Sequence, residues 1–292
     1  NLGNQPPANS LYKKNLNSPP AVPLRLLYCD ECSTVQLGED VDPEYLFSNY
    51  LWITGTSNTA NEYSHDFVEK ALSHFNGFER DLFVVEVASN DGTFLKHFQN
   101  NGCKVLGVDP ASNIASIASK NGIPTEPSFF SNELAAVLLK SHGSADLLYA
   151  RNVIPHVKEI HSVLSGIHKI LTSDGVGIIE FHNAGLLLDE LHYDYIYHEH
   201  LFYYTLTSID NLLRKHDLNI FDIAKRYPKL NVVIAHFFGN DLGFMKKASQ
   251  CKNLYVDISI NSRTLRINHA IYKHNFNNLL YGSDFPYDNQ GV

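Results

Sequence analysis

The spacing of hydrophobic and polar positions changes several times in the middle of the chain. Residues 83–87 form a short apolar run, partly β-branched, which is typical of a buried parallel strand. Residues 88–92 are small and polar, and residues 93–99 then place apolar side chains at helical spacing. A second apolar run at 104–108 ends in Asp109. This pattern predicts a strand–turn–helix–strand unit of the kind that forms one nucleoside-binding half of a doubly wound sheet.

The same alternation of strand-like and helix-like segments continues toward the C-terminus. Alternating strands and helices with short turns predict an α/β fold: a doubly wound, mainly parallel sheet with helices on both faces. Ligands of such sheets bind beyond the carboxyl ends of the strands. The side chains expected at that edge are Glu86, Asp109, Asn152 and Glu180. The other predicted helices are residues 66–75, 112–120, 132–140 and 157–171, and the other predicted strands are residues 146–150 and 176–181.

The acidic residues near the first two strand ends distinguish between nucleoside cofactors. A dinucleotide fold brings a pyrophosphate to the N-terminus of its first helix, so its turn is rich in glycine and carries no acid. Here Glu86 and Asp91 would repel a phosphate, whereas they suit the ammonium and sulfonium groups of S-adenosylmethionine (SAM). Asp109 is placed to accept hydrogen bonds from both ribose hydroxyls. The spacing favours a SAM site, and a plain α/β crossover with capping acids is the alternative.

Composition narrows the class of protein. The chain has 292 residues, enough for about two domains, with 44% hydrophobic residues and a net charge of −8. These values suit a globular protein and argue against nucleic acid as a main partner. Because no apolar run reaches membrane-spanning length and the N-terminus does not resemble a signal peptide, we expect no membrane partner and a cytoplasmic location.

Two of the four cysteines form a CxxC pair, Cys29 and Cys32. Such a pair between short strands is half of a tetrahedral zinc site, which needs four ligands. The other cysteines, Cys103 and Cys251, lie in unrelated segments, so two free structural thiols are the alternative. Few cysteines in a chain of this length fit a reducing compartment.

A loop rich in tyrosine and histidine, residues 193–204, carries the second candidate site. His200 could act as a general base, because the pKa of histidine lies near neutrality, with Glu199 beside it to assist. A nearby tyrosine hydroxyl could stabilise an enolate oxygen by hydrogen bonding. The alternative is an aromatic interface loop whose histidines only satisfy local hydrogen bonds.

Residues 2–224 contain an ordered series of motifs: LGNQPPAN, CDEC, EYLFSNYLWITGTS, EVASNDGTFL, GVDPASNIA, ARNVIPHV and IYHEHLFYYTLTSI. This series resembles one known family, the three-domain SAM-dependent sugar C-methyltransferases that act on keto-deoxysugar nucleotides. The resemblance implies a nucleotide-sugar substrate and a Rossmann-like methyltransferase domain at residues 63–205, and it leaves the oligomeric state open. It further implies an N-terminal part at 1–62 that is ribbon-like and aromatic, and the start of a C-terminal domain at 206–224.

The resemblance also implies roles for individual residues. The catalytic histidine would be His200, assisted by Tyr197 and Glu199, with Tyr50 of the aromatic N-terminal stretch reaching into the same site. The residues expected to bind the cofactor are Glu86, Ser89, Asn90, Gly92, Asp109, Asn152 and His156. The family also has a zinc ribbon with an earlier CxxC, so either the ribbon here is truncated or its metal is lost. We expect Cys29 and Cys32 alone not to hold zinc tightly.

The chain departs from the family pattern at two places. Ala88 occupies a turn position where glycine is common, which costs about 1 kcal/mol if its φ is positive. Residues 225–292 instead resemble the end of a metal-dependent amidohydrolase barrel, with three strand-like segments and the candidate site residues His236 and Asp284. Two rival hypotheses follow: a metal hydrolase that uses His198 and His200 with these two residues, and a non-catalytic chimeric remnant.

Overall fold

The computed structural model describes residues 1–8, 21–75, 81–189, 191–218 and 220, together with three short strands nearer the C-terminus. The chain divides into two compact units, Asn1–Asp217 and Leu218–Val292. In the part of the chain described here, none of the helices combines the length and the apolar character needed to cross a bilayer.

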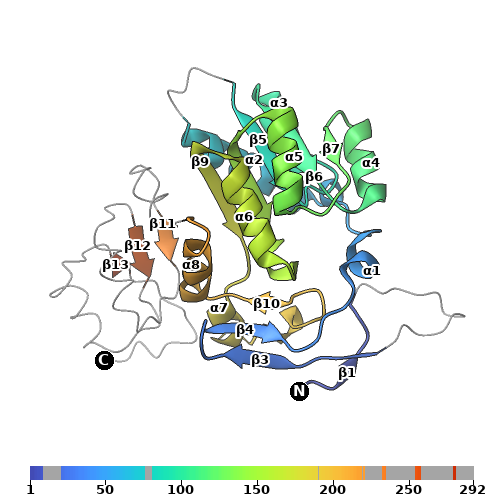
Figure 1. Ribbon diagram of the computed structural model, residues 1–292, viewed down its shortest axis with the longest axis vertical. Helices are drawn as coiled ribbons and strands as arrows, with labels where there is room; N and C mark the ends of the chain where they lie inside the picture. Colours follow the sequence, from blue (N-terminus) through green and yellow to red (C-terminus); the bar gives the residue numbers. More distant parts are fainter. Residues whose placement is uncertain are drawn as a thin grey trace, which may run out of the picture. The chain divides into compact units, whose positions relative to one another are not determined.

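The first unit is built on a five-stranded sheet in which every pair of neighbours is parallel (Figure 1). The strand order is β7-β6-β5-β8-β9, so the chain leaves the central strand β5 first to one side and then to the other. The interior strands are apolar on both faces because helices cover both. The bounds are β5 Phe83–Val87, β6 Lys104–Val108, β7 Thr125–Glu126, β8 Ala145–Arg151 and β9 Leu171–Glu180.

The helices form two layers, as right-handed crossovers require for this strand order. Helix α2 packs against α3, and α5 lies beside α6 over the sheet in Figure 1. Phe94, Phe98 and Tyr149 are among the large side chains that are fully buried. The helices of this domain are α2 Asn58–Ser73, α3 Thr93–Asn100, α4 Ser112–Lys120, α5 Asn132–His142 and α6 Ile160–Ile170.

The predicted α/β fold is confirmed, and β5, β6 and α4 have the predicted bounds. The largest difference lies after α6, where the sequence predicts that the next strand begins only at residue 176. The structure continues as strand from Leu171, because Leu171 pairs with Ala145 before the register shifts and Val176 pairs with Leu147. A register irregularity of this kind lets a strand begin early without moving its apolar residues off the core face.

A second, antiparallel sheet joins the N-terminal part to the loop rich in tyrosine and histidine. Strands β3 (Leu26–Cys29) and β4 (Thr34–Leu37) form a hairpin, and β10 (Phe202–Tyr203) pairs with β4. A small core of Leu24, Ala184, Leu187, Ile196 and Tyr203 lies under this sheet. The remaining elements of the unit are β1 Asn4–Gln5, β2 Val22–Pro23, α1 Pro43–Phe47, η1 Thr54–Thr56, η2 Ile154–His156, α7 Ala184–Asp189, η3 Tyr193–Tyr195 and α8 Leu206–Arg214.

The second unit contains three parallel strands in sequential order, β11 (Val232–Ile234), β12 (Leu254–Asp257) and β13 (Leu279–Leu280). The three segments predicted as barrel-like strands are therefore strands that pair in parallel, as consecutive strands of an α/β barrel do. The candidate hydrolase residues His236 and Asp284, and Cys251, lie outside the described residues.

Candidate active site

The turn after β5 has an unusual backbone. Ala88, Asn90 and Gly92 all have positive φ, at 54°, 51° and 78°. Asparagine and glycine tolerate this region, but the Cβ of alanine approaches the backbone there and costs about 1–2 kcal/mol. The turn therefore stores strain at Ala88. This is the cost that the sequence analysis predicts for an alanine with positive φ at a position where glycine is common.

Asp109, at the end of β6, is buried and bonded to the same turn. Its Oδ2 accepts a hydrogen bond from the Asn90 amide at 2.8 Å, and its Oδ1 accepts one from the Ala111 amide at 2.9 Å. Burial raises the pKa of Asp109, and these two amides oppose the shift. Each carboxylate oxygen retains one lone pair, which suits it to accept from two ribose hydroxyls. Beside it, Ser89 Oγ is buried with no hydrogen-bond partner among the described residues.

Glu86 lies deeper in the sheet than the turn. One oxygen accepts from the Tyr149 hydroxyl at 3.0 Å, and the other lies 3.3 Å from Arg151 Nη2. Burial raises the pKa of Glu86 to about 8, against the opposing effects of Arg151 and Tyr149. Sequence reasoning missed Tyr149 and Arg151. The signal for them was that they lie two residues apart, and therefore on the same face, in the strand that pairs with β5.

The ends of β8 and β9 supply further predicted residues. Asn152 has a φ of 52° and donates its backbone amide to the Glu180 carbonyl at 2.8 Å. His156 follows on η2, and burial together with His200 lowers its pKa to about 3. The imidazole of His156 is therefore neutral at physiological pH, and among the described residues its buried Nδ1 has no hydrogen-bond partner.

His200 is held in one tautomer by the backbone. Its Nδ1 donates to the Tyr195 carbonyl at 2.7 Å, which leaves the lone pair on Nε2. Its ring centroid lies 4.3 Å from that of Tyr197 and 4.7 Å from that of His156. Burial lowers the pKa of His200, so the ring is neutral and able to accept a proton at neutral pH. These features are those of a general base held by its second nitrogen.

Tyr50 is linked to His200 by a series of ring contacts. Its ring is 6.3 Å from that of Phe47, which in turn lies 5.7 Å from His156. Burial, then the charges of Glu199 and Asp109, raise the pKa of Tyr50 to about 12. The phenol therefore stays protonated as a hydrogen-bond donor. Burial followed by Glu199 also raises the pKa of Tyr197.

The predicted residues thus lie along one edge of the sheet. Ser89, Asn90 and Gly92 follow the end of β5, Asp109 directly follows β6, and Asn152 and His156 follow β8. The ring contacts from Tyr50 through Phe47 and His156 reach His200 without a break. Glu86 is the predicted residue that the structure places in the interior, where Tyr149 and Arg151 engage both its oxygens.

His198, the other histidine of the loop, has a different environment. Its Nε2 hydrogen-bonds the Val22 carbonyl at 3.1 Å, so it fastens the loop to β2. Among the described residues, His198 and His200 do not belong to any cluster of metal-ligating side chains. The other two ligands of the metal hydrolase hypothesis, His236 and Asp284, lie outside the described residues.

The cysteine pair offers part of a zinc site. Cys29 and Cys32 are free, half-buried thiols on the β3–β4 hairpin. Hydrogen bonding, first with Thr34, lowers the pKa of Cys32, which favours the thiolate that binds metal. They supply two of the four ligands of a tetrahedral site, and the described residues place no third ligand with them.

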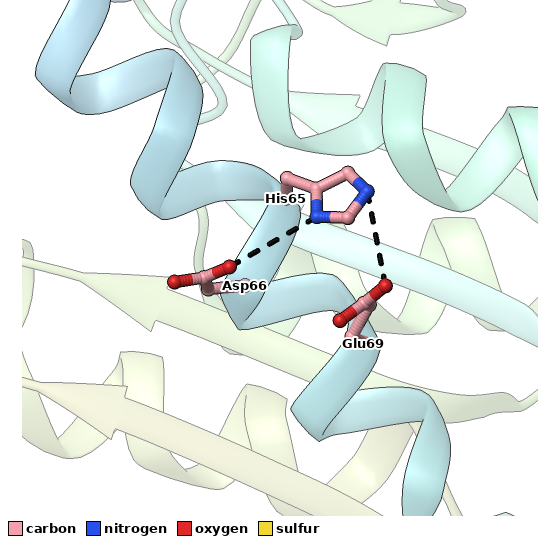
Figure 2. Close-up of side chains that lie close together, drawn as sticks. All are labelled: His65, Asp66 and Glu69. Carbon is pink, nitrogen blue, oxygen red and sulfur yellow. Dashed lines mark ion pairs between the residues drawn. The ribbon is translucent and has the colours of Figure 1, made fainter.

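Figure 2 shows the single group of potential ligands that come close together in the described residues: His65, Asp66 and Glu69 on α2. The Nδ1 of His65 lies 3.9 Å from a carboxylate oxygen of Asp66, and its Nε2 lies 3.8 Å from one of Glu69. All three side chains are more than half exposed. Exposed ion pairs between helix neighbours contribute little to stability. We interpret this group as a solvated helix face.

A parallel sheet of this order, with a carboxylate at the second strand end and a tight turn after the first, defines the nucleoside-cofactor class of α/β domains. The family described as "Methyltransferase domain" matches residues 60–223, more than half of the chain. The chain belongs to this methyltransferase family. The family "Putative zinc binding domain" matches residues 1–47, and the family "Amidohydrolase" matches residues 208–292.

Individual proteins are also similar to this chain. The C-methyltransferase NovU of Streptomyces niveus is 32% identical over 201 residues, which cover 69% of this chain and 48% of NovU. The chain thus spans about half the length of that relative. A SAM-dependent methyltransferase from Archaeoglobus fulgidus is 18% identical with a TM-score of 0.43, covering 53% of this chain and 68% of the other. Magnesium protoporphyrin IX methyltransferase from Synechocystis is 14% identical with a TM-score of 0.39, covering 53% and 67%.

Proposed function

We propose that this protein transfers the methyl group of SAM to a carbon next to a ketone in a keto-deoxysugar nucleotide, with His200 as the base. The observation that carries the proposal is the fixed tautomer of His200, whose Nδ1–H is held by the Tyr195 carbonyl while Nε2 remains able to accept a proton. The similarity to the C-methyltransferase NovU supports carbon as the atom that is methylated.

The residues of this chain suit SAM at the β5–β6 edge. Asp109 has lone pairs for ribose hydroxyls, and Ser89 Oγ is a buried polar atom without a partner in the described part of the chain. When bound there, SAM supplies an electrophilic methyl group on a sulfonium. We propose that Asn90, Gly92, Asn152 and His156 complete this site, and that Glu86 supports it from beneath through Tyr149 and Arg151.

The remaining residues prepare the acceptor carbon. A carbon can take a methyl group only when it is nucleophilic, and a neighbouring ketone makes its proton acidic enough for His200 to remove. The carbon–hydrogen bond then breaks, its electron pair forms the enolate, and the proton moves to Nε2. Tyr50 and Tyr197 stay protonated and can donate to the enolate oxygen. Glu199, which is buried, lies close enough to influence both phenols. Holding the two reactants together contributes much of the rate enhancement.

The decisive experiment separates proton removal from methyl transfer. We incubate the full chain with a keto-deoxysugar nucleotide in deuterated water and follow exchange of the proton next to the ketone by NMR, with and without SAM. Wild-type protein is expected to exchange this proton and, with SAM, to methylate the carbon. His200→Gln should slow both reactions by about 10² or more while it still binds SAM in a calorimetric titration.

His65→Gln is the matched control, because it removes an exposed histidine from α2. It should leave exchange and methylation at the wild-type rate. Unchanged proton exchange in His200→Gln would exclude His200 as the base. Failure of the wild-type chain to bind SAM would remove the basis of the proposal.

We also propose a division of the chain into four parts: residues 1–62, 63–205, 206–224 and 225–292.

A further inference from the structure

Two asparagines hold the backbone of the aromatic N-terminal stretch against the cofactor turn. Asn113 Oδ1 accepts from the Tyr50 amide at 3.2 Å, and its Nδ2 donates to the Tyr50 carbonyl at 2.9 Å. Asn90 Oδ1 accepts from the Thr54 amide at 2.8 Å, and its Nδ2 donates to the Trp52 carbonyl at 3.0 Å. Each side-chain amide therefore uses its acceptor and one of its donors on this stretch.

The two contacts on Tyr50 are of a particular kind. Asn113 bonds both the N–H and the C=O of one residue, as a neighbouring strand does in a sheet. Such a pair fixes the orientation of the peptide groups on both sides of the Tyr50 Cα. Fixing these groups also fixes the direction of the Cα–Cβ bond, and hence where the phenol can reach.

Asn113 is itself tied to the cofactor site. It lies in the first turn of α4, directly after the segment in which Asp109 accepts from the Ala111 amide. Asp109 also accepts from the amide of Asn90, so one carboxylate holds both Asn90 itself and Ala111, which lies two residues before Asn113. The position of the Tyr50 backbone is therefore set relative to Asp109, the residue expected to hold the ribose, although 63 residues separate Tyr50 from Asn113.

On its other side, Tyr50 faces the base. Its ring contacts Phe47, and Phe47 packs edge-on against His156, which contacts His200. Tyr50 is half-buried in this position. A phenol so placed lies between the two halves of the proposed reaction, and a displacement of about 1 Å in such a group can lower a rate 10²-fold.

We propose that Asn113 is a positioning residue for this site: its side-chain amide holds the Tyr50 backbone so that the Tyr50 hydroxyl lies between Asp109 and the Tyr197–His200 loop. This inference rests on the proposed function for the role of Tyr50 in turnover. The clamp itself is a statement about the folded chain, and it can be measured without any substrate.

The first measurement is hydrogen exchange in the full chain, followed by mass spectrometry of peptides that cover residues 49–56. Asn113→Ala removes both hydrogen bonds to Tyr50, and exchange at the Tyr50 amide should accelerate about tenfold, because each bond contributes a few-fold protection. Asn101→Ala is the matched control. It removes one asparagine hydrogen bond, to the His97 carbonyl, at the C-terminal end of α3. It should leave hydrogen exchange in the peptides that cover residues 49–56 unchanged.

Asn113→Asp separates the clamp from helix stability. A carboxylate in the first turn of α4 favours the helix through the helix dipole, and it still accepts from the Tyr50 amide, but it cannot donate to the Tyr50 carbonyl. If Asn113 acts by positioning Tyr50, Asn113→Asp lowers turnover, because the bond to the Tyr50 carbonyl is lost even though the Tyr50 amide keeps its acceptor. If Asn113 only stabilises α4, Asn113→Asp matches or exceeds the wild type, and the proposal is overturned.

A double-mutant cycle tests whether Asn113 acts through Tyr50. With a keto-deoxysugar nucleotide as acceptor, Asn113→Ala should lower kcat about tenfold or more and change the SAM dissociation constant less than about threefold. The double variant with Tyr50→Phe should be no slower than the slower single variant, because both remove one function. Multiplicative effects would overturn the proposal. If the wild-type chain does not turn over but Asn113→Ala still frees the Tyr50 amide, the proposed function fails and the clamp stands; unchanged exchange refutes the clamp itself.

Discussion

Replacing His156 by phenylalanine should make the protein more resistant to acid. The folded-state pKa of His156, about 3, lies below the ordinary value of 6.5, with burial as the main cause. Folding therefore excludes a proton that the unfolded chain binds. The stability associated with the neutral ring is complete above about pH 6.5 and is lost as the pH falls toward about 3.

The size of the effect follows from this shift. Between pH 6.5 and about pH 5, excluding one proton costs roughly 1.36 kcal/mol per unit, or about 2 kcal/mol in total. Phenylalanine retains a flat ring that can pack edge-on against Phe47, now 5.7 Å away, but it cannot be protonated. We therefore expect His156→Phe to lose about 2 kcal/mol less stability than the wild type between about pH 7 and about pH 5.

The assay is urea unfolding of the full chain at both pH values. Circular dichroism is the first probe, and the emission of Trp52, the single tryptophan of the sequence, reports on the unit Asn1–Asp217. His65→Phe, which removes an exposed histidine from α2, controls for the loss of any imidazole. Equal losses of stability in His156→Phe and the wild type would show that His156 is protonated within the folded protein, and the reasoning from burial would be wrong.

Three further predictions concern the cofactor edge. Burial raises the pKa of Glu86 to about 8, so the contribution of its neutral carboxyl to the free energy of unfolding should be complete below about pH 4.5 and be lost as the pH rises to about 8. Glu86→Gln should remove this pH dependence and, in urea unfolding at neutral pH, cost less than about 1 kcal/mol. Breaking an ionised pair with Arg151 would instead cost about 3–5 kcal/mol. Ala88→Gly should raise the melting temperature, by an amount equivalent to about 1 kcal/mol, since glycine relieves the positive φ; a lower melting temperature would contradict the strain. In Gly107→Ala the new Cβ would lie 2.3 Å from Ser89 Oγ, so we expect a loss of about 1–3 kcal/mol and weaker SAM binding by calorimetry, and wild-type affinity would show that the turn can move without cost.

The sequence predicts the sheet well because local pattern and burial agree there. Apart from Glu86 and Lys104, residues 83–87 and 104–108 are apolar, and nearly all of them are buried, so their bounds are as predicted. The two-residue strand β7 was missed because it is too short to show a period. In β9, pairing with β8 extends the strand across Asp174-Gly175 and overrides the local turn signal.

The candidate site was predictable in its residue types but not in its connections. Asp109 and His200 stand out by position and chemistry, whereas the partners of Glu86 lie 63 and 65 residues away on another strand. Asn113 carries no local signal, because an asparagine in the first turn of a helix usually serves the helix itself. Contacts between distant segments depend on the packed fold, and spacing in one sequence does not encode them directly.

The pairing of β10 with β4 limits how this protein can be divided. The matched methyltransferase region begins at residue 60, yet the strand that directly follows His200 takes its partner from residues 34–37. His198 is likewise fastened to the Val22 carbonyl. A shortened protein that starts at residue 60 would keep every residue of the parallel sheet but lose the strand that supports His200, the proposed base. Engineers who wish to transplant this catalytic unit must carry the N-terminal hairpin with it.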